Sequence, residues 1–173
     1  KPQTIKRFGL GWAPDSWDSL IRFMTAQGFS ANDLKAAGLV SDSGGKIFDR
    51  FRGRVMYPII DHKNNVIGFG GRTLEKDAPA KYLNTAENLV YKKGQNLYAL
   101  HYAKNSKRKE IILCEGYMDV ISLHQNGFDN AVASCGTALT PDQARLLRRY
   151  TEDVVLCYDS DEAGKKATRR ALD

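Results

Sequence analysis

Three short apolar runs in the last third of the chain constrain its fold more than any other feature. They occupy residues 111–113 (Ile-Ile-Leu), 131–133 (Ala-Val-Ala) and 154–156 (Val-Val-Leu). Because the runs are continuous rather than alternating, they predict strands that are covered on both faces. Helix-like stretches of roughly 10–15 residues separate them, which is typical of βαβ units. This part of the chain is therefore predicted to be an α/β fold around a parallel sheet.

Acidic residues follow two of these runs. Glu115 comes after the first run, and Asp159 and Asp161 come after the third. The carboxyl ends of parallel strands share one edge of the sheet, which is where such sheets bind their ligands. Three carboxylates at one edge repel one another unless a cation lies among them. Oxygen ligands suit Mg²⁺ or Mn²⁺, so the sequence predicts a site for one of these ions.

Simpler roles for these acids stay open. An Asp before Glu162 could cap a helix by accepting hydrogen bonds from its first amides. A calcium loop that starts at Asp159 is excluded, because its twelfth position is Arg170, where a bidentate Glu is required. Asp119 is expected in the first turn of a helix. It would either interact with the helix dipole or lie in the outer shell of the metal.

The first hundred residues predict a different, mixed α+β architecture. Residues 15–40 have the apolar spacing of two short helices, the first capped by Asp15 or Ser16 and the second by Ser30. Two apolar segments, 55–60 and 66–69, are joined by a polar turn and predict an antiparallel hairpin.

Basic residues and glycines surround this hairpin in the sequence. Arg50, Arg52 and Arg54 alternate, so they are expected to lie along one strand and to share a face. That face would either be solvated or bind an anion. The glycines at 68, 70 and 71 predict a strand that other parts of the chain approach closely.

Several short motifs resemble a known family. A strand that ends in Glu115-Gly116, followed by one that ends in Asp159-Ser160-Asp161-Glu162-Ala163-Gly164, resembles the Toprim domain. The flanking motifs resemble the RNA polymerase domain of bacterial DNA primases, from about residue 5 to the end. These motifs are Arg7-Phe8-Gly9-Leu10-Gly11, Asp49-Arg50-Phe51-Arg52-Gly53-Arg54, Gly68-Phe69-Gly70-Gly71-Arg72, Lys81-Tyr82-Leu83-Asn84, Glu115-Gly116-Tyr117-Met118-Asp119-Val120, Ala131-Val132-Ala133-Ser134 and Cys157-Tyr158-Asp159.

The resemblance implies a fold and an activity. Residues 1–105 would form a basic α+β subdomain, and residues 106–173 an incomplete Toprim domain. The protein would synthesise short RNA primers on single-stranded DNA, with Glu115, Asp159 and Asp161 as catalytic metal ligands. Positions of the basic surface that guides template and nucleotide in this family are matched by Arg7, Arg72, Lys81, Tyr82, Asn84 and Lys93.

The resemblance also implies partners. These are the DNA template, ribonucleoside triphosphates, the RNA–DNA hybrid, and a replicative helicase that binds through regions outside this sequence. Members of the family carry a further acidic strand and a helical subdomain after the segment matched here. We therefore expect residues 1–173 to be part of a longer protein and to be inactive alone.

Bulk properties agree with this interpretation. The formal net charge is +6, which weakly favours polyanionic partners. No apolar run is long enough for a membrane span, and no signal peptide or Cys-x-x-Cys pair is present, so a cytoplasmic protein with three buried free thiols is expected. Two other function classes stay open. One is a different Toprim enzyme, a topoisomerase or nuclease. The other is a non-catalytic module that binds nucleic acid or nucleotide.

Overall fold

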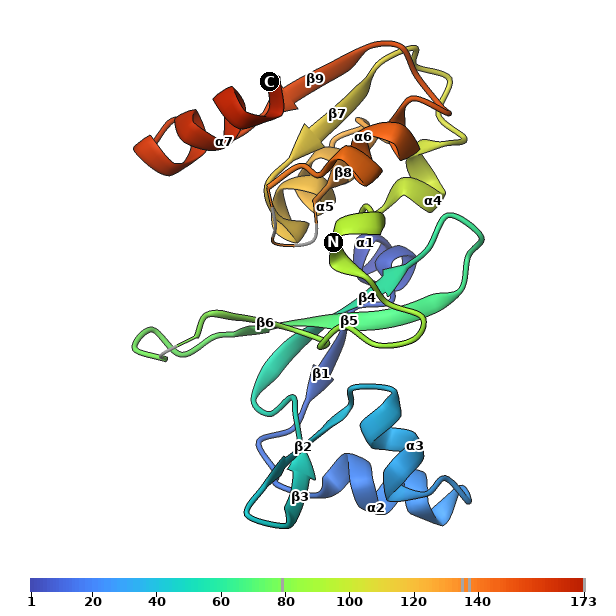
Figure 1. Ribbon diagram of the computed structural model, residues 1–173, viewed down its shortest axis with the longest axis vertical. Coiled ribbons are helices and arrows are strands. Elements are labelled where there is room, and N and C mark those ends of the chain that lie inside the picture. Colours follow the sequence, from blue (N-terminus) through green and yellow to red (C-terminus); the bar gives the residue numbers. More distant parts are fainter. Residues whose placement is uncertain (79, 135, 137, 173) are drawn as a thin grey trace. The chain divides into compact units, whose positions relative to one another are not determined.

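A computed structural model describes residues 1–78, 80–134, 136 and 138–172, which divide into two compact units (Figure 1). The N-terminal unit comprises Pro2–Pro58 and Ile67–Tyr91. The C-terminal unit comprises residue 1, the hairpin tip Ile59–Val66 and the chain from Lys92 onward. The chain therefore enters the C-terminal unit at the hairpin tip, returns to the N-terminal unit at Ile67, and passes into the C-terminal unit again at Lys92.

The N-terminal unit is built on a four-stranded sheet with the strand order β1-β4-β5-β6. The expected hairpin is confirmed as β4 and β5, whose turn is closed by the Asp61 amide donating to the Asn65 carbonyl at 2.9 Å. A smaller antiparallel hairpin, β2-β3, and three helices complete the unit. The elements are α1 (Pro2–Phe8), β1 (Gly11–Ala13), α2 (Ser19–Ala26), α3 (Ala31–Ala36), β2 (Val40–Ser43), β3 (Lys46–Asp49), β4 (Arg54–Ile60), β5 (Val66–Thr73) and β6 (Tyr82–Asn84).

The two short helices predicted in residues 15–40 are confirmed as α2 and α3, but only one of their caps is local. Ser30 caps α3 as predicted, and its hydroxyl accepts a hydrogen bond from the Asp33 amide at 3.2 Å. Neither Asp15 nor Ser16 caps α2. The carboxylate of Asp49, at the end of β3, accepts from the Leu20 amide at 2.7 Å and the Ile21 amide at 3.0 Å. A carboxylate about 30 residues away in sequence thus replaces the local cap.

The glycines of β5 admit close neighbours, as predicted. A Cβ built on Gly71 would lie 2.8 Å from Cδ1 of Phe51, and one on Gly68 would lie 3.3 Å from Cβ of Thr85. Tighter contacts than about 3.0 Å are essentially never seen for real Cβ atoms, so a side chain at position 71 would displace the buried Phe51 ring. These glycines are explained by packing within the unit.

The prediction that Arg50, Arg52 and Arg54 alternate along one strand is wrong. Strand β3 ends at Asp49 and β4 begins at Arg54, so the first two arginines lie in the connection. Gly53 has φ +55°, a left-handed conformation that interrupts an extended strand. The three side chains therefore have separate directions and separate partners.

The C-terminal unit contains the predicted parallel sheet, with the order β8-β7-β9. Helices α4, α5 and α6 and the core side chains Leu97, Leu100, Leu113, Val132 and Leu147 surround its centre. A capping box starts α6, since the Thr140 hydroxyl accepts from the Gln143 amide at 3.1 Å. The elements are η1 (Lys93–Gln95), α4 (Leu100–Ala103), β7 (Ile111–Cys114), α5 (Tyr117–Gln125), β8 (Ala131–Ala133), α6 (Pro141–Leu147), β9 (Val154–Cys157) and α7 (Glu162–Leu172).

The burial of the three parallel strands differs from the prediction at β9. Strand β8 is fully buried and β7 is nearly so, as continuous apolar runs predict. Strand β9 is exposed, with Val154 and Val155 at 40% and 48% of their maximal accessible surface. It lies at one end of the described sheet, where it has a single neighbouring strand. Cys157 is consequently exposed rather than buried, Cys114 is buried as expected, and Cys135 lies outside the described residues.

We predict that Asp49→Ala destabilises the protein by about 2 kcal/mol, because it leaves two amides at the start of α2 without an acceptor. Asp18→Ala is the matched control. Asp18 occupies the N-cap position of α2 but makes no capping hydrogen bond, and its carboxylate pairs only with exposed groups such as Arg22. Chemical denaturation of both variants measures the difference. Equal losses in the two variants would contradict the capping role of Asp49.

Candidate active site

The predicted acidic residues gather at the carboxyl edge of the parallel sheet. Cys114 pairs with Cys157 in register, so Glu115 and the segment that begins at Tyr158 leave the sheet side by side. The Asp159 amide donates to Oε1 of Glu115 at 3.3 Å. The backbone of one acidic residue thus orients the carboxylate of another.

The pKa of Glu115 is raised in part by the charges of neighbouring carboxylates. Burial raises its pKa, and the charges of Asp159, Asp161 and Asp119 raise it further, against a lowering by the Asp159 amide. Three neighbouring carboxylates therefore act on Glu115 at this edge of the sheet. Such a cluster favours either a bound cation or a proton.

Two of these carboxylates also have the simpler roles that the sequence left open. Oδ1 of Asp161 accepts from the Gly164 amide at 2.8 Å in the first turn of α7. Oδ2 of Asp119 accepts from the Gly116 amide at 3.1 Å at the start of α5. A Cβ on Gly164 would overlap the carbonyl oxygen of Asp159, so glycine is needed there for α7 to start so close to the acidic segment. Each carboxylate keeps an oxygen that these hydrogen bonds do not use.

The donor chemistry of the cluster fits Mg²⁺ or Mn²⁺, which prefer carboxylate oxygens. Within the described part of the chain, no three His, Cys, Asp or Glu side chains converge closely enough to hold a metal ion. The sheet edge therefore carries carboxylates of the kind that bind these ions, but in the described residues they do not converge on one point.

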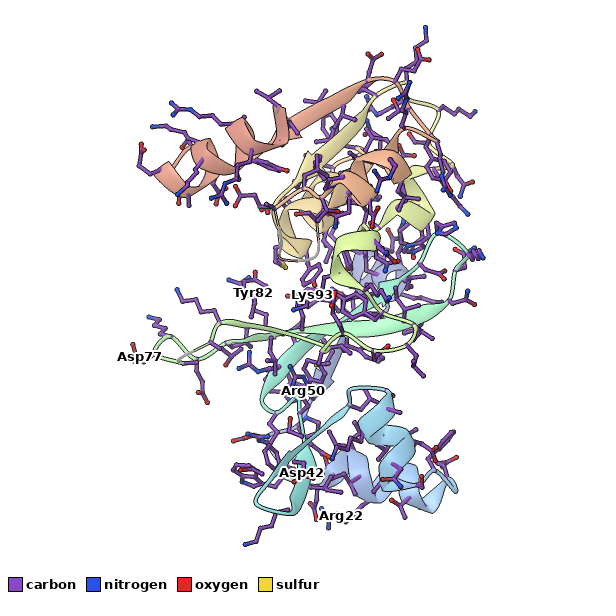
Figure 2. The ribbon with its side chains drawn as sticks, viewed as in Figure 1. Arg22, Asp42, Arg50, Asp77, Tyr82 and Lys93 are labelled. Carbon is purple, nitrogen blue, oxygen red and sulfur yellow. The ribbon has the colours of Figure 1, made fainter. Side chains whose placement is uncertain are left out.

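The basic residues of the N-terminal unit bind the segment that contains β6. Arg50 donates to the Asn84 carbonyl at 3.0 Å. Arg54 donates to the carbonyls of Ala80 at 3.0 Å and Lys81 at 3.2 Å. Figure 2 labels Arg50 and Tyr82 in this unit. The two arginines thus fix the position of the loop and strand that carry Lys81, Tyr82 and Asn84.

Other members of the predicted set have aromatic or solvent contacts. The guanidinium of Arg72 lies 5.5 Å from the centroid of the Tyr82 ring, which is 45% exposed. Arg52 stacks at 3.9 Å on Trp17, away from the strand that it was expected to share. Burial and then the charge of Arg52 lower the pKa of Arg54, so two cations are held near one another. Arg7 and Lys81 are exposed.

Lys93 belongs to the C-terminal unit, in the 3-10 turn η1. Its carbonyl accepts a hydrogen bond from the side chain of Gln143 at 3.0 Å. Gln143 is fully buried and also donates to the Asn96 carbonyl at 2.8 Å, so α6 holds this turn in place.

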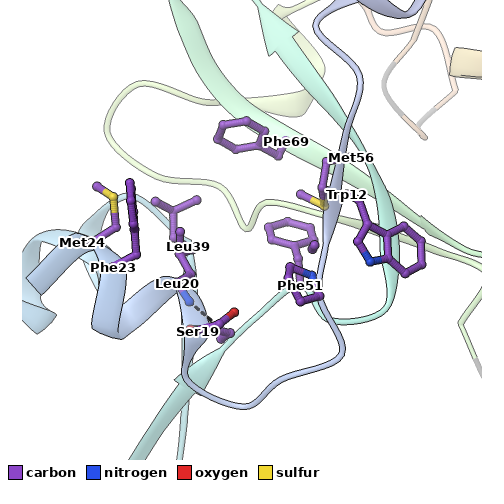
Figure 3. A pocket seen from close by; sticks show the side chains of 12 residues that line it. Trp12, Ser19, Leu20, Phe23, Met24, Leu39, Phe51, Met56 and Phe69 are labelled. Atoms are coloured by element: carbon purple, nitrogen blue, oxygen red, sulfur yellow. Dashed lines mark hydrogen bonds between the residues drawn. The ribbon is translucent and has the colours of Figure 1, made fainter. Parts of the chain in front are cut away.

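The N-terminal unit also contains an apolar pocket of about 550 Å³ between α2 and the sheet. Figure 3 shows Phe23, Met24, Phe51 and Phe69 around it. Asp49 is its one ionisable lining residue, and both of its oxygens already accept amide hydrogen bonds. The pocket therefore offers little to a phosphate or a metal ion.

Sequence reasoning missed several residues that shape the sites. Asp49 and Gln143 make long-range hydrogen bonds that no local motif announces. Tyr158, Lys166 and Arg170 line a cavity beside Glu115, a role that the sequence analysis does not predict. Helical spacing of 166 and 170 was the available signal.

We predict that Glu115→Gln stabilises the protein at pH 7 in metal-free buffer. A carboxyl whose pKa is raised in the folded state costs stability as the pH rises through its unfolded pKa of about 4.3 and its higher folded pKa. The gain should vanish below about pH 4, where both states are protonated. Thermal unfolding across pH tests this, with the exposed Glu152→Gln as control. A gain that persists at low pH would contradict the electrostatic origin.

Known families match both parts of the chain. The family model described as DNA primase catalytic core, N-terminal domain, matches residues 1–104, and the Toprim-like model matches residues 112–173. A DNA primase of Clostridium acetobutylicum is 52% identical over 172 residues, which cover 99% of this chain and 29% of that protein. A DNA primase of Escherichia coli K12 is 45% identical over 174 residues, or 99% of this chain and 30% of the relative. The chain thus spans less than a third of these relatives.

Solved structures agree. A primase catalytic domain bound to single-stranded DNA is 42% identical, with a TM-score of 0.89 over 99% of this chain and 54% of that one. The RNA polymerase domain of the Mycobacterium tuberculosis primase is 38% identical, with a TM-score of 0.91 over 100% of this chain and 60% of the other. No helix in the described residues is long and apolar enough to cross a membrane. The acidic sheet edge and these matches together place the chain in the DNA primase catalytic core family.

Proposed function

We propose that this chain carries the nucleotidyl-transfer site of a primase, an enzyme that joins ribonucleoside triphosphates into RNA primers on single-stranded DNA. The observation that carries the proposal is the gathering of Glu115, Asp159 and Asp161 at the carboxyl edge of the parallel sheet. The relative whose structure contains single-stranded DNA supports a DNA template as the partner.

Glu115, Asp159 and Asp161 would hold Mg²⁺ or Mn²⁺, with Asp119 in the outer shell. When bound, such an ion would lower the pKa of the attacking hydroxyl and neutralise phosphate charge. In the proposed reaction, the primer 3′-oxygen would bond to the α-phosphorus as the bond to pyrophosphate breaks, and the hydroxyl proton would pass to solvent water. The chain's contribution is orientation: the Asp159 amide holds Glu115, and the Gly164 amide holds Asp161.

The basic residues would bind the nucleic acid. Lys81 is exposed on the segment that Arg50 and Arg54 fix, so it can neutralise a phosphate. Tyr82 offers an exposed ring for stacking on a base, and Asn84 can hydrogen-bond a sugar or base. We assign template and hybrid binding to residues 1–105 and chemistry to residues 106–173, with Arg7, Arg52, Arg72 and Lys93 as further contacts.

We predict that Asp159→Asn abolishes primer synthesis by the full-length protein while its affinity for single-stranded DNA changes less than about twofold. The substitution removes one metal-binding charge with almost no change in volume. Primer synthesis from labelled ribonucleotides and Mn²⁺ binding are the measurements. Asp153→Asn, an exposed acid at the opposite end of β9, is the control. Normal synthesis by Asp159→Asn would disprove this metal site.

We predict different effects for two neighbours on the basic surface. Lys81→Ala should weaken binding of all single-stranded sequences alike and reduce the salt slope by about 0.7, the value for one phosphate contact. Tyr82→Ala should cost roughly 1–3 kcal/mol through lost stacking and leave the slope unchanged. Affinity is measured against salt concentration, with Lys46→Ala, an exposed lysine of the same unit, as control. If Lys81→Ala and Lys46→Ala have the same slope as the wild type, Lys81 is only a solvated residue.

A further inference from the structure

A cavity of about 380 Å³ opens directly beside Glu115, within the C-terminal unit. Its walls come from Glu115 after β7, from Ser134, Gly136 and Ala138 after β8, and from one face of α7. That face consists of Ala163, Lys166, Ala167 and Arg170, which recur at helical spacing. The small alanines leave room, and the two long side chains place positive charges around it.

The two cations of this face have no compensating partner. Among the residues that the structure describes, neither Lys166 nor Arg170 forms an ion pair. The adjacent Lys165 donates to Glu162 at 2.9 Å and does not line the cavity. The lysine and the arginine that face the cavity are thus available for an anion from outside the chain.

A third group at the cavity lacks a partner as well. The hydroxyl of Tyr158, another lining residue, is buried and has no hydrogen-bond partner within the described ranges. A tyrosine hydroxyl is a hydrogen-bond donor, so this group can donate to an acceptor. A buried donor without an acceptor is costly, and a bound anion or water would satisfy it.

The cavity is lined by two cationic side chains and one carboxylate, and this combination favours one class of ligand. Two cations suit phosphate groups, but Glu115 in the same wall repels a bare phosphate. A polyphosphate that carries a divalent cation satisfies both, since its cation meets the carboxylate and its outer phosphates meet the basic side chains. A continuous DNA strand fits less well, because the lining is concave and lies at the proposed site of chemistry.

We propose that Lys166 and Arg170 bind the β- and γ-phosphates of the incoming ribonucleoside triphosphate in this cavity, with Tyr158 as an additional donor. This inference rests on the proposed function, since it places the future pyrophosphate next to the carboxylates that would hold the metal. The two side chains bind substrate and hold the leaving group. They therefore set the affinity for nucleotides that have three phosphates.

The test compares two double variants of the full-length protein. Lys166→Gln/Arg170→Gln removes both cavity charges, and Lys165→Gln/Arg169→Gln removes the same residue types one position earlier on the same helix. Binding of ATP and of AMP is measured with Mg²⁺ and with a chelator, and binding of single-stranded DNA is measured separately. Thermal unfolding verifies that both variants fold.

We expect the cavity variant to bind ATP at least about tenfold more weakly, as loss of charge-assisted contacts implies, and to bind AMP as the wild type does. The control variant should bind both nucleotides normally. Exchanging the two residues, as Lys166→Arg/Arg170→Lys, keeps the charges and should restore most of the ATP affinity. In primer synthesis the cavity variant should show a raised KM for nucleotides.

Three results would overturn the proposal. These are unchanged ATP binding by the cavity variant, equal losses in both double variants, and a loss of DNA binding without a loss of ATP binding. The last result would assign the two charges to the DNA backbone. The ratio of ATP to AMP affinity is independent of catalysis, so an absence of primer synthesis by the wild type would refute the proposed function without deciding this one.

Discussion

The parallel register of β7 and β9 is the constraint on which the rest of the candidate site depends. Cys114 lies opposite Cys157, so the residues that follow each strand emerge together at one edge. A slip of one residue would reverse the faces of all later side chains and would separate Glu115 from the Asp159 amide that orients it. Strand pairing therefore brings the residues of the candidate site together, and their side chains then determine its chemistry.

Helix α7 extends that constraint into the space beyond the sheet. Gly164 lets the helix begin against the backbone of Asp159, and Asp161 fixes its first turn. Once the start of the helix is fixed, its periodicity decides which charges face the cavity: Lys166 and Arg170 do, and Lys165 does not. One short segment thus places carboxylates at the sheet edge and basic groups about two turns further on.

Local signals predicted much of this fold. The apolar runs identified the parallel strands, and the caps at Ser30 and Thr140 follow from residues within three positions of each other. The sequence could not show that Asp49 caps α2, because that hydrogen bond joins residues 29 positions apart. Nor could an alternating pattern show that Gly53 interrupts the arginine segment with a positive φ. The exposure of β9 was missed because apolar composition does not tell a central strand from one at the end of the sheet.

The acidic residues illustrate why residue type alone leaves roles open. Asp161 and Asp119 each cap a helix through one carboxylate oxygen and contribute charge at Glu115 at the same time, so capping and ligand binding are compatible. What separates the two roles is the repulsion that the other carboxylates exert on Glu115, because a helix cap does not relieve it.

The basic residues also fall into two groups: some hold other parts of the chain, and others are exposed. Arg50 and Arg54 donate to backbone carbonyls of the segment around β6, so their first effect is to position Lys81 and Tyr82. Under the proposed function, loss of either arginine would weaken nucleic-acid binding even without a direct phosphate contact, because the segment around β6 would lose its anchor. A net charge of +6 is therefore no measure of how many basic side chains are free to meet a phosphate. Phosphate binding is best tested at basic side chains that make no such bonds within the described residues. These are Lys81 on one unit and Lys166 and Arg170 on the other.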